Sequence, residues 1–105
     1  QTLYQIVFCP KDRAPVMTKE NRPELFKYIW GVLNKKNCHL YRINGVEDHL
    51  HIITDLHPSV SLASLVKDIK VSSSIYIKKN KLFEGLEVGQ LATELLRIVF
   101  MLKTT

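Results

Sequence analysis

The stretch Glu47-Asp48-His49-Leu50-His51-Ile52-Ile53-Thr54-Asp55 combines the pattern of a buried β-strand with two closely spaced histidines. Alternate side chains of a strand share a face, so His49 and His51 are expected to lie together, opposite Leu50 and Ile52. Two neutral imidazoles on a rigid strand suit a divalent metal ion, which can polarise a phosphate ester. Spacing alone favours a structural histidine pair, and a metal bound here would need a further ligand from elsewhere.

The composition is that of one globular domain with an excess of positive charge. Of 105 residues, 46% are hydrophobic, and the formal net charge is +5 at pH 7. This charge favours a polyanionic partner, nucleic acid before an acidic membrane surface, although ordinary solubility explains it equally well. No apolar run approaches the roughly 20 residues that span a bilayer, and residues 1–10 lack the features of a signal peptide. We therefore expect a cytoplasmic protein without a membrane partner.

The segment before the histidines predicts a strand and then a helix. Leu3–Cys9 is rich in β-branched and aromatic residues, which is typical of a strand, and residues 10–15 form a loop. A helix is predicted over Glu20–Asn37, with Asn21 as its cap and a hydrophobic stripe that includes Trp30. Cys9 and Cys38 lie in apolar stretches, so we expect buried thiols rather than a disulfide or a zinc motif.

The following segments predict two strands and a second helix. Cys38–Val46 is the first of these strands, and its Asn44-Gly45 pair is typical of a hairpin turn or a bulge. Asp48–Asp55 is the histidine-bearing strand. A long helix capped by Ser59 or Ser61 then reaches about Lys79, with Ile75 among its apolar positions.

This order of elements predicts a ferredoxin-like α+β fold, in which helices pack on one face of an antiparallel sheet, as in RNA-recognition modules. The fold needs a fourth strand after the second helix. Residues 82–89 have the composition of a loop, and Leu91–Leu102 is apolar and compatible with a helix. The expected fourth strand is therefore not evident from the sequence, and the apolar tail taking its place is left as an open alternative.

Basic side chains outside the histidine strand are candidates for contacts with a DNA backbone, although a solvated helix face is the better explanation of the helical ones taken alone. These candidates are Lys11, Arg13, Lys67, Lys70, Lys78 and Lys79. The chain has four tyrosines, each in an element where packing explains an aromatic residue, so none is assigned as a nucleophile.

Four segments together resemble the single-tyrosine HUH transposases of small bacterial insertion sequences, the TnpA type or IS200-like family. They are Tyr4–Lys11, Asp48–Ile53, Pro58–Ser61 and Leu65–Lys70, the last followed by three serines at 72–74. The resemblance covers roughly residues 3 to 85 and is far more specific than the histidine pair alone.

The resemblance implies a ferredoxin-like sheet, a homodimer formed by joining sheets edge to edge, and recognition of DNA hairpins. It also implies cleavage and rejoining of single-stranded DNA, with Mg²⁺ or Mn²⁺ held by the histidines that match His49 and His51. In this family a tyrosine on a C-terminal helix forms a 5′-phosphotyrosine link, and a nearby glutamine completes the metal site.

The tail after residue 85 departs from the family pattern, and neither that tyrosine nor that glutamine is matched. Permissible codons for Leu91–Thr105, read from the third base of the first codon, can encode GYGAFTYRFHAKDD, which contains the strand expected in the family. We therefore expect a frameshift between about Gly85 and Leu91 in the encoding gene.

The sequence thus predicts a transposase-like domain over residues 1–85 and a non-family apolar tail over residues 86–105. We expect binding of hairpin or single-stranded transposon-end DNA with a divalent metal, and no catalytic residue is assigned. The expected product is therefore inactive in cleavage. Two alternatives remain: a non-enzymatic nucleic-acid-binding domain of the same fold, and a structural or partner-binding domain with an incidental histidine pair.

Overall fold

The computed structural model describes residues 2–10, 15, 17–83 and 96–104. Along the chain it contains β1 (Leu3–Pro10), α1 (Arg22–Lys35), β2 (Leu40–Val46), β3 (His49–Thr54), α2 (Leu62–Asn80) and β4 (Leu96–Thr104). Among the described residues no helix is both long and apolar enough to cross a membrane.

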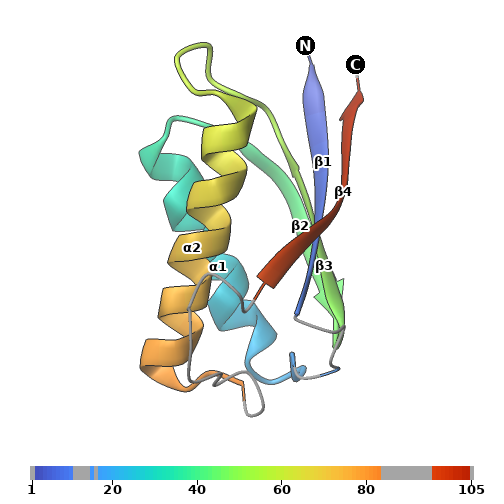
Figure 1. Ribbon diagram of the computed structural model, residues 1–105, viewed down its shortest axis with the longest axis vertical. Coiled ribbons are helices and arrows are strands. Elements are labelled where there is room, and N and C mark those ends of the chain that lie inside the picture. Colours follow the sequence, from blue (N-terminus) through green and yellow to red (C-terminus); the bar gives the residue numbers. More distant parts are fainter. Residues whose placement is uncertain (1, 11–14, 16, 84–95, 105) are drawn as a thin grey trace.

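The four strands form one sheet in the order β2-β3-β1-β4, and every neighbouring pair is antiparallel. Both helices lie on the same side of this sheet, and the two ends of the chain lie next to each other at one end of β1 and β4 (Figure 1). This arrangement confirms the predicted ferredoxin-like α+β class. It also makes β3 and β1 the two interior strands.

The hydrophobic core lies between the sheet and the helices. Alternate residues of the interior strands supply its sheet side, since Ile6 and Phe8 of β1 and Leu50 and Ile52 of β3 are fully buried. From the helices come fully buried leucines and isoleucines, namely Leu25, Ile29, Leu33, Leu65 and Ile69. Each such side chain contributes about 1.5–3 kcal/mol by leaving water. Because the apolar set of β3 faces the helices, its alternate residues face outward on the open side of the sheet.

The helices begin close to where they were predicted. Of the two predicted cap residues, only the one before α2 makes a capping hydrogen bond with its side chain. Ser61 caps α2 by accepting a hydrogen bond from the Ser64 N–H at 3.1 Å. Asn21 is the N-cap residue of α1, as predicted, but its side chain makes no capping hydrogen bond, and its amide donates to the Leu82 carbonyl at 2.8 Å. Trp30 and Ile75, predicted as apolar helix positions, are about half exposed and lie outside the core.

Two predictions about the strands are wrong. Asn44 and Gly45 lie within β2, while the hairpin turn is formed by Glu47 and Asp48, and the irregular register falls between Leu40 and Arg42. The apolar tail is a strand rather than a helix over Leu96–Thr104, and it supplies the missing fourth strand beside β1.

Other sequence predictions have separate outcomes. Cys9 and Cys38 are buried and form no disulfide with each other, as predicted. The expected frameshift position lies at residues 85–91, outside the described residues, so the frameshift and the domain boundary at 85 stay predictions.

Candidate functional site

His49 and His51 project from β3 on the open face of the sheet, away from the helices. Their ring centroids are 4.9 Å apart and the rings are tilted by 59°, which confirms the predicted shared face. Both residues are half-buried, whereas Leu50 and Ile52 between and beside them are fully buried on the helix side. Since β3 is hydrogen-bonded to β2 and β1, the backbone holds both rings in fixed positions.

Asp48 orients the first of these rings. It lies in the turn between β2 and β3, where the Met17 N–H donates to the Glu47 carbonyl at 3.0 Å. The Asp48 Oδ1 and the His49 Nδ1 are 2.8 Å apart. Because a carboxylate only accepts, Nδ1 must carry the proton, and a neutral His49 therefore keeps its lone pair on Nε2. Hydrogen bonding of this kind is typical of metal-binding histidines.

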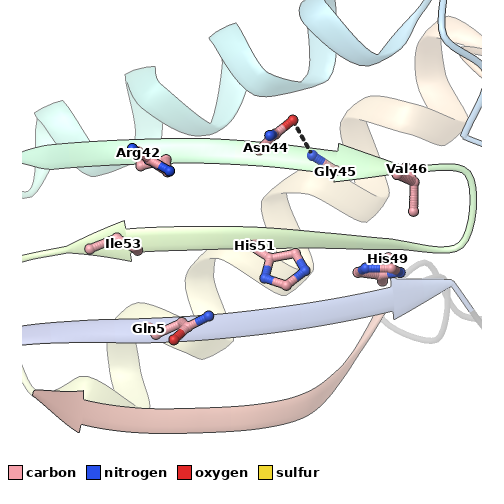
Figure 2. A pocket seen from close by; sticks show the side chains of 8 residues that line it. All are labelled: Gln5, Arg42, Asn44, Gly45, Val46, His49, His51 and Ile53. Carbon is pink, nitrogen blue, oxygen red and sulfur yellow. Dashed lines mark hydrogen bonds between the residues drawn. The ribbon is translucent and has the colours of Figure 1, made fainter.

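The histidines line an open pocket of about 340 Å³ on this face of the sheet. Figure 2 shows residues from three adjacent strands around it: Gln5 from β1, the histidines and Ile53 from β3, and Arg42, Asn44, Gly45 and Val46 from β2. The strand register places these side chains in rows across the sheet, with Asn44 opposite His51 and Arg42 opposite Ile53. A ligand that reaches the imidazoles therefore touches the two strands beside them as well.

The charge of this pocket favours an anion. Arg42 is exposed, and it makes no ion pair with another residue in the described part of the chain. No carboxylate is among the residues that line the pocket, and Asp48, which precedes His49 in the chain, is hydrogen-bonded to it. A divalent metal ion at the imidazoles and the Arg42 guanidinium would be two positively charged groups facing a phosphate.

Gly45 allows β2 to pass close to the histidine strand. A Cβ atom on Gly45 would lie 2.8 Å from the His49 carbonyl oxygen and 3.0 Å from the Leu50 Cβ. Both neighbours belong to the buried, interior strand β3, so neither can easily move away. The glycine predicted as a turn residue thus serves the packing of the strand that carries the site.

The structure does not bring the predicted DNA-binding lysines to this pocket. Lys67, Lys78 and Lys79 are exposed and Lys70 is half-buried, and all four lie on α2 in the helix layer, on the other side of the sheet from the histidines. Lys11 and Arg13 lie outside the described residues. DNA contacts by these six residues stay predictions.

None of the residues lining the pocket is a tyrosine. Tyr76 stacks on Tyr28 at 4.1 Å between ring centroids and donates its hydroxyl to the Glu24 carboxylate at 2.6 Å. This hydrogen bond raises the pKa of Tyr76 above its usual value of 10.0. Tyr41 makes an edge contact with His39. These contacts agree with the predicted packing roles for these three tyrosines.

Sequence reasoning missed Gln5, Arg42 and Asn44 as neighbours of the histidines. Gln5 alternates with the buried Ile6 in β1, which marks it as a residue of the open face. That alternation does not reveal which residue of β3 lies opposite, because strand register depends on pairing between distant segments. The sequence therefore indicates which face of the sheet Gln5 lies on, but not which residues of the next strand lie beside it.

The donor set of the pocket fits a divalent cation. It contains two imidazoles and two side-chain amides, and nitrogen and neutral oxygen donors of this kind bind such ions. Among the described residues there is no group of three or more His, Cys, Asp or Glu side chains that could hold a metal. Within the part of the chain that the structure describes, a third protein ligand would therefore be of another type.

Comparison with known proteins gives a consistent result. A family model described as "Transposase IS200 like" matches residues 1–87. The chain is 27% identical over 74 residues to the transposase for insertion sequence element IS200 of Salmonella typhimurium strain LT2, and equally to that of Salmonella typhi. The matched region is 70% of this chain and 49% of each relative, so the chain spans about half the length of these curated relatives.

The fold is also found in a solved structure. A crystal structure of a proposed transposase from Deinococcus radiodurans R1 superimposes with a TM-score of 0.79 at 17% sequence identity. The superposition covers 98% of this chain and 77% of the other. At this level of identity the comparison shows the shared fold.

Proposed function

Because this chain belongs to the family of IS200-like transposases, we propose that it is a DNA-binding transposase domain whose open sheet face receives hairpin or single-stranded DNA. A divalent ion, Mg²⁺ or Mn²⁺, binds there to His49 and His51. The observation that carries this proposal is the pair of imidazoles on one face of an interior strand, with His49 oriented by Asp48, in an open pocket.

Each residue of the pocket has a role that follows from its chemistry. His49 offers Nε2 because Asp48 fixes the proton on Nδ1, and His51 offers a second nitrogen beside it. Arg42 binds a DNA phosphate, since its guanidinium makes no ion pair with another described residue. The metal, when bound, polarises a phosphate oxygen and neutralises its charge.

We propose that this chain binds DNA and does not cleave it through a phosphotyrosine. No tyrosine belongs to the described lining of the pocket, and the sequence after residue 85 does not match the family segment that bears the nucleophile. A frameshift in the encoding gene is the proposed origin of that mismatch. Sequencing of the encoding DNA tests it, because a coding sequence with no family-like peptide in another frame contradicts the frameshift.

Metal titration tests the central proposal. Mn²⁺ affinity is measured by electron paramagnetic resonance of the free ion, and binding of a fluorescent single-stranded oligonucleotide is measured with and without Mn²⁺. We expect His49→Ala and His51→Ala to abolish Mn²⁺ binding and the metal-dependent part of DNA binding. His57→Ala is the matched control, because it removes an imidazole that is hydrogen-bonded to Ser59 in the loop before α2. It should change neither Mn²⁺ binding nor DNA binding.

The outcomes separate the alternatives. DNA binding that is indifferent to Mn²⁺ and to both histidine variants would favour a non-enzymatic nucleic-acid-binding domain. Failure to bind any hairpin or single-stranded DNA at low salt would favour a structural domain. A covalent protein–DNA adduct after incubation with single-stranded transposon-end DNA and Mn²⁺ would contradict the proposed lack of cleavage.

A homodimer is part of the same proposal. The sheet ends in β2 on one side and in β4 on the other, and a sheet edge is a template for pairing with another strand. Light scattering coupled to gel filtration tests this directly: a monomer mass at every protein concentration would exclude the dimer.

A further inference from the structure

Gln5 lies on the same face of the sheet as the two histidines. It is paired with Ile53, and Val7, two residues further along β1, is paired with His51. Directly opposed residues of antiparallel strands share a face, so Gln5 is a diagonal neighbour of His51. It lines the pocket together with both histidines, and Figure 2 shows its side chain on β1 beside the histidine-bearing strand.

The amide of Gln5 makes no hydrogen bond to another residue that the structure describes, although the residue is half-buried. Asn44, the other amide of the pocket, differs, because its Oδ1 accepts a hydrogen bond from the Gly45 N–H at 2.8 Å. The remaining side chains beside the histidines carry no oxygen: Arg42, Val46 and Ile53. Within the described lining, Gln5 is thus the residue whose side-chain oxygen makes no hydrogen bond to another described residue.

Glutamine is long enough to reach an ion bound beside His51, its diagonal neighbour, while His49 lies two residues further along β3. Diagonal neighbours in antiparallel strands are roughly 7–8 Å apart, within reach of a long side chain, and Mg²⁺ lies about 2 Å from each ligand. Mg²⁺ and Mn²⁺ favour oxygen ligands, which the imidazoles do not supply. We propose that Oε1 of Gln5 is the third protein ligand of a divalent ion held by His49 and His51, an inference that rests on the metal site proposed above.

A neutral third ligand has a consequence for the DNA. Two neutral imidazoles and an amide leave the ion with its full double positive charge, whereas a carboxylate ligand would cancel part of it. With only three protein ligands, coordination positions also stay open for water or a phosphate oxygen. The site therefore binds the ion modestly and keeps its attraction for the DNA backbone.

Two substitutions at Gln5 with opposite expected signs test the inference by Mn²⁺ titration of the whole chain. Gln5→Met keeps the length of the side chain and removes its oxygen, so we expect about tenfold weaker Mn²⁺ binding, in the range seen when groups that support a metal site are removed. Gln5→Glu keeps the shape and adds a negative charge, so Mn²⁺ should bind more tightly than in the unmodified chain. A folding defect cannot produce that increase. Asn44→Ala tests the other amide of the pocket. The control is His57→Ala, whose imidazole is not among the residues lining the pocket, and it should leave Mn²⁺ affinity unchanged.

The results distinguish the role of Gln5 from the proposed metal site at His49 and His51, on which it rests. If His51→Ala abolishes Mn²⁺ binding while Gln5→Met and Gln5→Glu both bind like the unmodified chain, the metal site stands and the role of Gln5 is refuted. If His51→Ala leaves Mn²⁺ affinity unchanged, the metal site itself is refuted. Loss of Mn²⁺ binding in Asn44→Ala, with Gln5→Met unchanged, would assign the third ligand to the other amide.

Discussion

Replacement of Asp48 by asparagine separates the orienting role of this carboxylate from simple ligand loss. Asp48 accepts the Nδ1–H of His49 at 2.8 Å, which leaves Nε2 free to bind a metal. Asparagine has nearly the same shape, but its amide can rotate and present its NH₂ group to Nδ1. The ring would then be stabilised with its proton on Nε2, where it blocks the metal.

The size of the effect follows from the hydrogen bond and its exposure. A hydrogen bond to a charged group contributes roughly 1.5–3 kcal/mol. The side chains of His49 and Asp48 are 30% and 35% exposed, so solvent weakens the interaction and the lower end applies. A loss of about 1.5 kcal/mol corresponds to roughly tenfold weaker Mn²⁺ binding. Asp48→Asn should therefore still bind Mn²⁺, about tenfold more weakly, whereas His49→Ala should not bind it.

Mn²⁺ titration monitored by paramagnetic resonance measures this difference, with thermal unfolding as the check on folding. Asp48→Glu serves as the companion variant, because it keeps the charge and displaces the oxygen. Mn²⁺ affinity equal to that of the unmodified chain in Asp48→Asn, alongside complete loss in His49→Ala, would refute the claim that Asp48 sets the tautomer of His49.

Three further predictions concern the strand contacts, the DNA backbone and the helix layer. Gly45→Ala should destabilise the fold by about 1–3 kcal/mol in urea unfolding, because the added Cβ would lie 2.8 Å from the His49 carbonyl oxygen. Arg42→Ala should weaken binding of single-stranded DNA and reduce the slope of log affinity against log salt by about 0.7, as expected for one lost phosphate contact, while Arg42→Lys should keep most of the slope. The pKa of Tyr76 in an ultraviolet titration should lie above 10.0, since its hydroxyl donates a hydrogen bond to the Glu24 carboxylate. Because the folded-state pKa is raised, the stabilisation is present below pH 10 and is lost as the pH rises through the raised pKa, and Glu24→Gln should bring the pKa back towards 10.0.

The sequence predicted the parts of the fold that depend on local periodicity. The alternation of His49, Leu50, His51 and Ile52 identified both the strand and its two faces, and the buried face is the one that packs under the helices. The same reasoning failed for Leu96–Thr104, because a short apolar run without alternation is compatible with either a helix or a strand. What decides its conformation is the open edge of β1, which is a non-local feature.

The Asn44-Gly45 pair shows a second kind of limit. This dipeptide is a strong hairpin signal because both residues tolerate positive φ. Neither residue has a positive φ here, and the positive-φ residues other than glycine in the described chain are Asn37 and Lys81. Gly45 is needed for its missing Cβ, which allows β2 to approach β3. A glycine in the sequence can indicate either a turn or a close approach of two strands. Only its neighbours in the folded structure show which of the two applies.

The same argument explains why half of the candidate site was predictable and half was not. His49 and His51 lie two positions apart in one strand, so the local alternation of that strand is enough to place their side chains on the same face. Gln5 reaches them only through the pairing of β1 with β3, whose residues are more than forty positions apart in the chain. That pairing is secured on its other side by β4, since backbone hydrogen bonds along β1 require an extended partner and place few demands on its side chains. An apolar tail without the alternation typical of a strand can therefore still hold β1 inside the sheet, and with it the position of Gln5 beside the histidines.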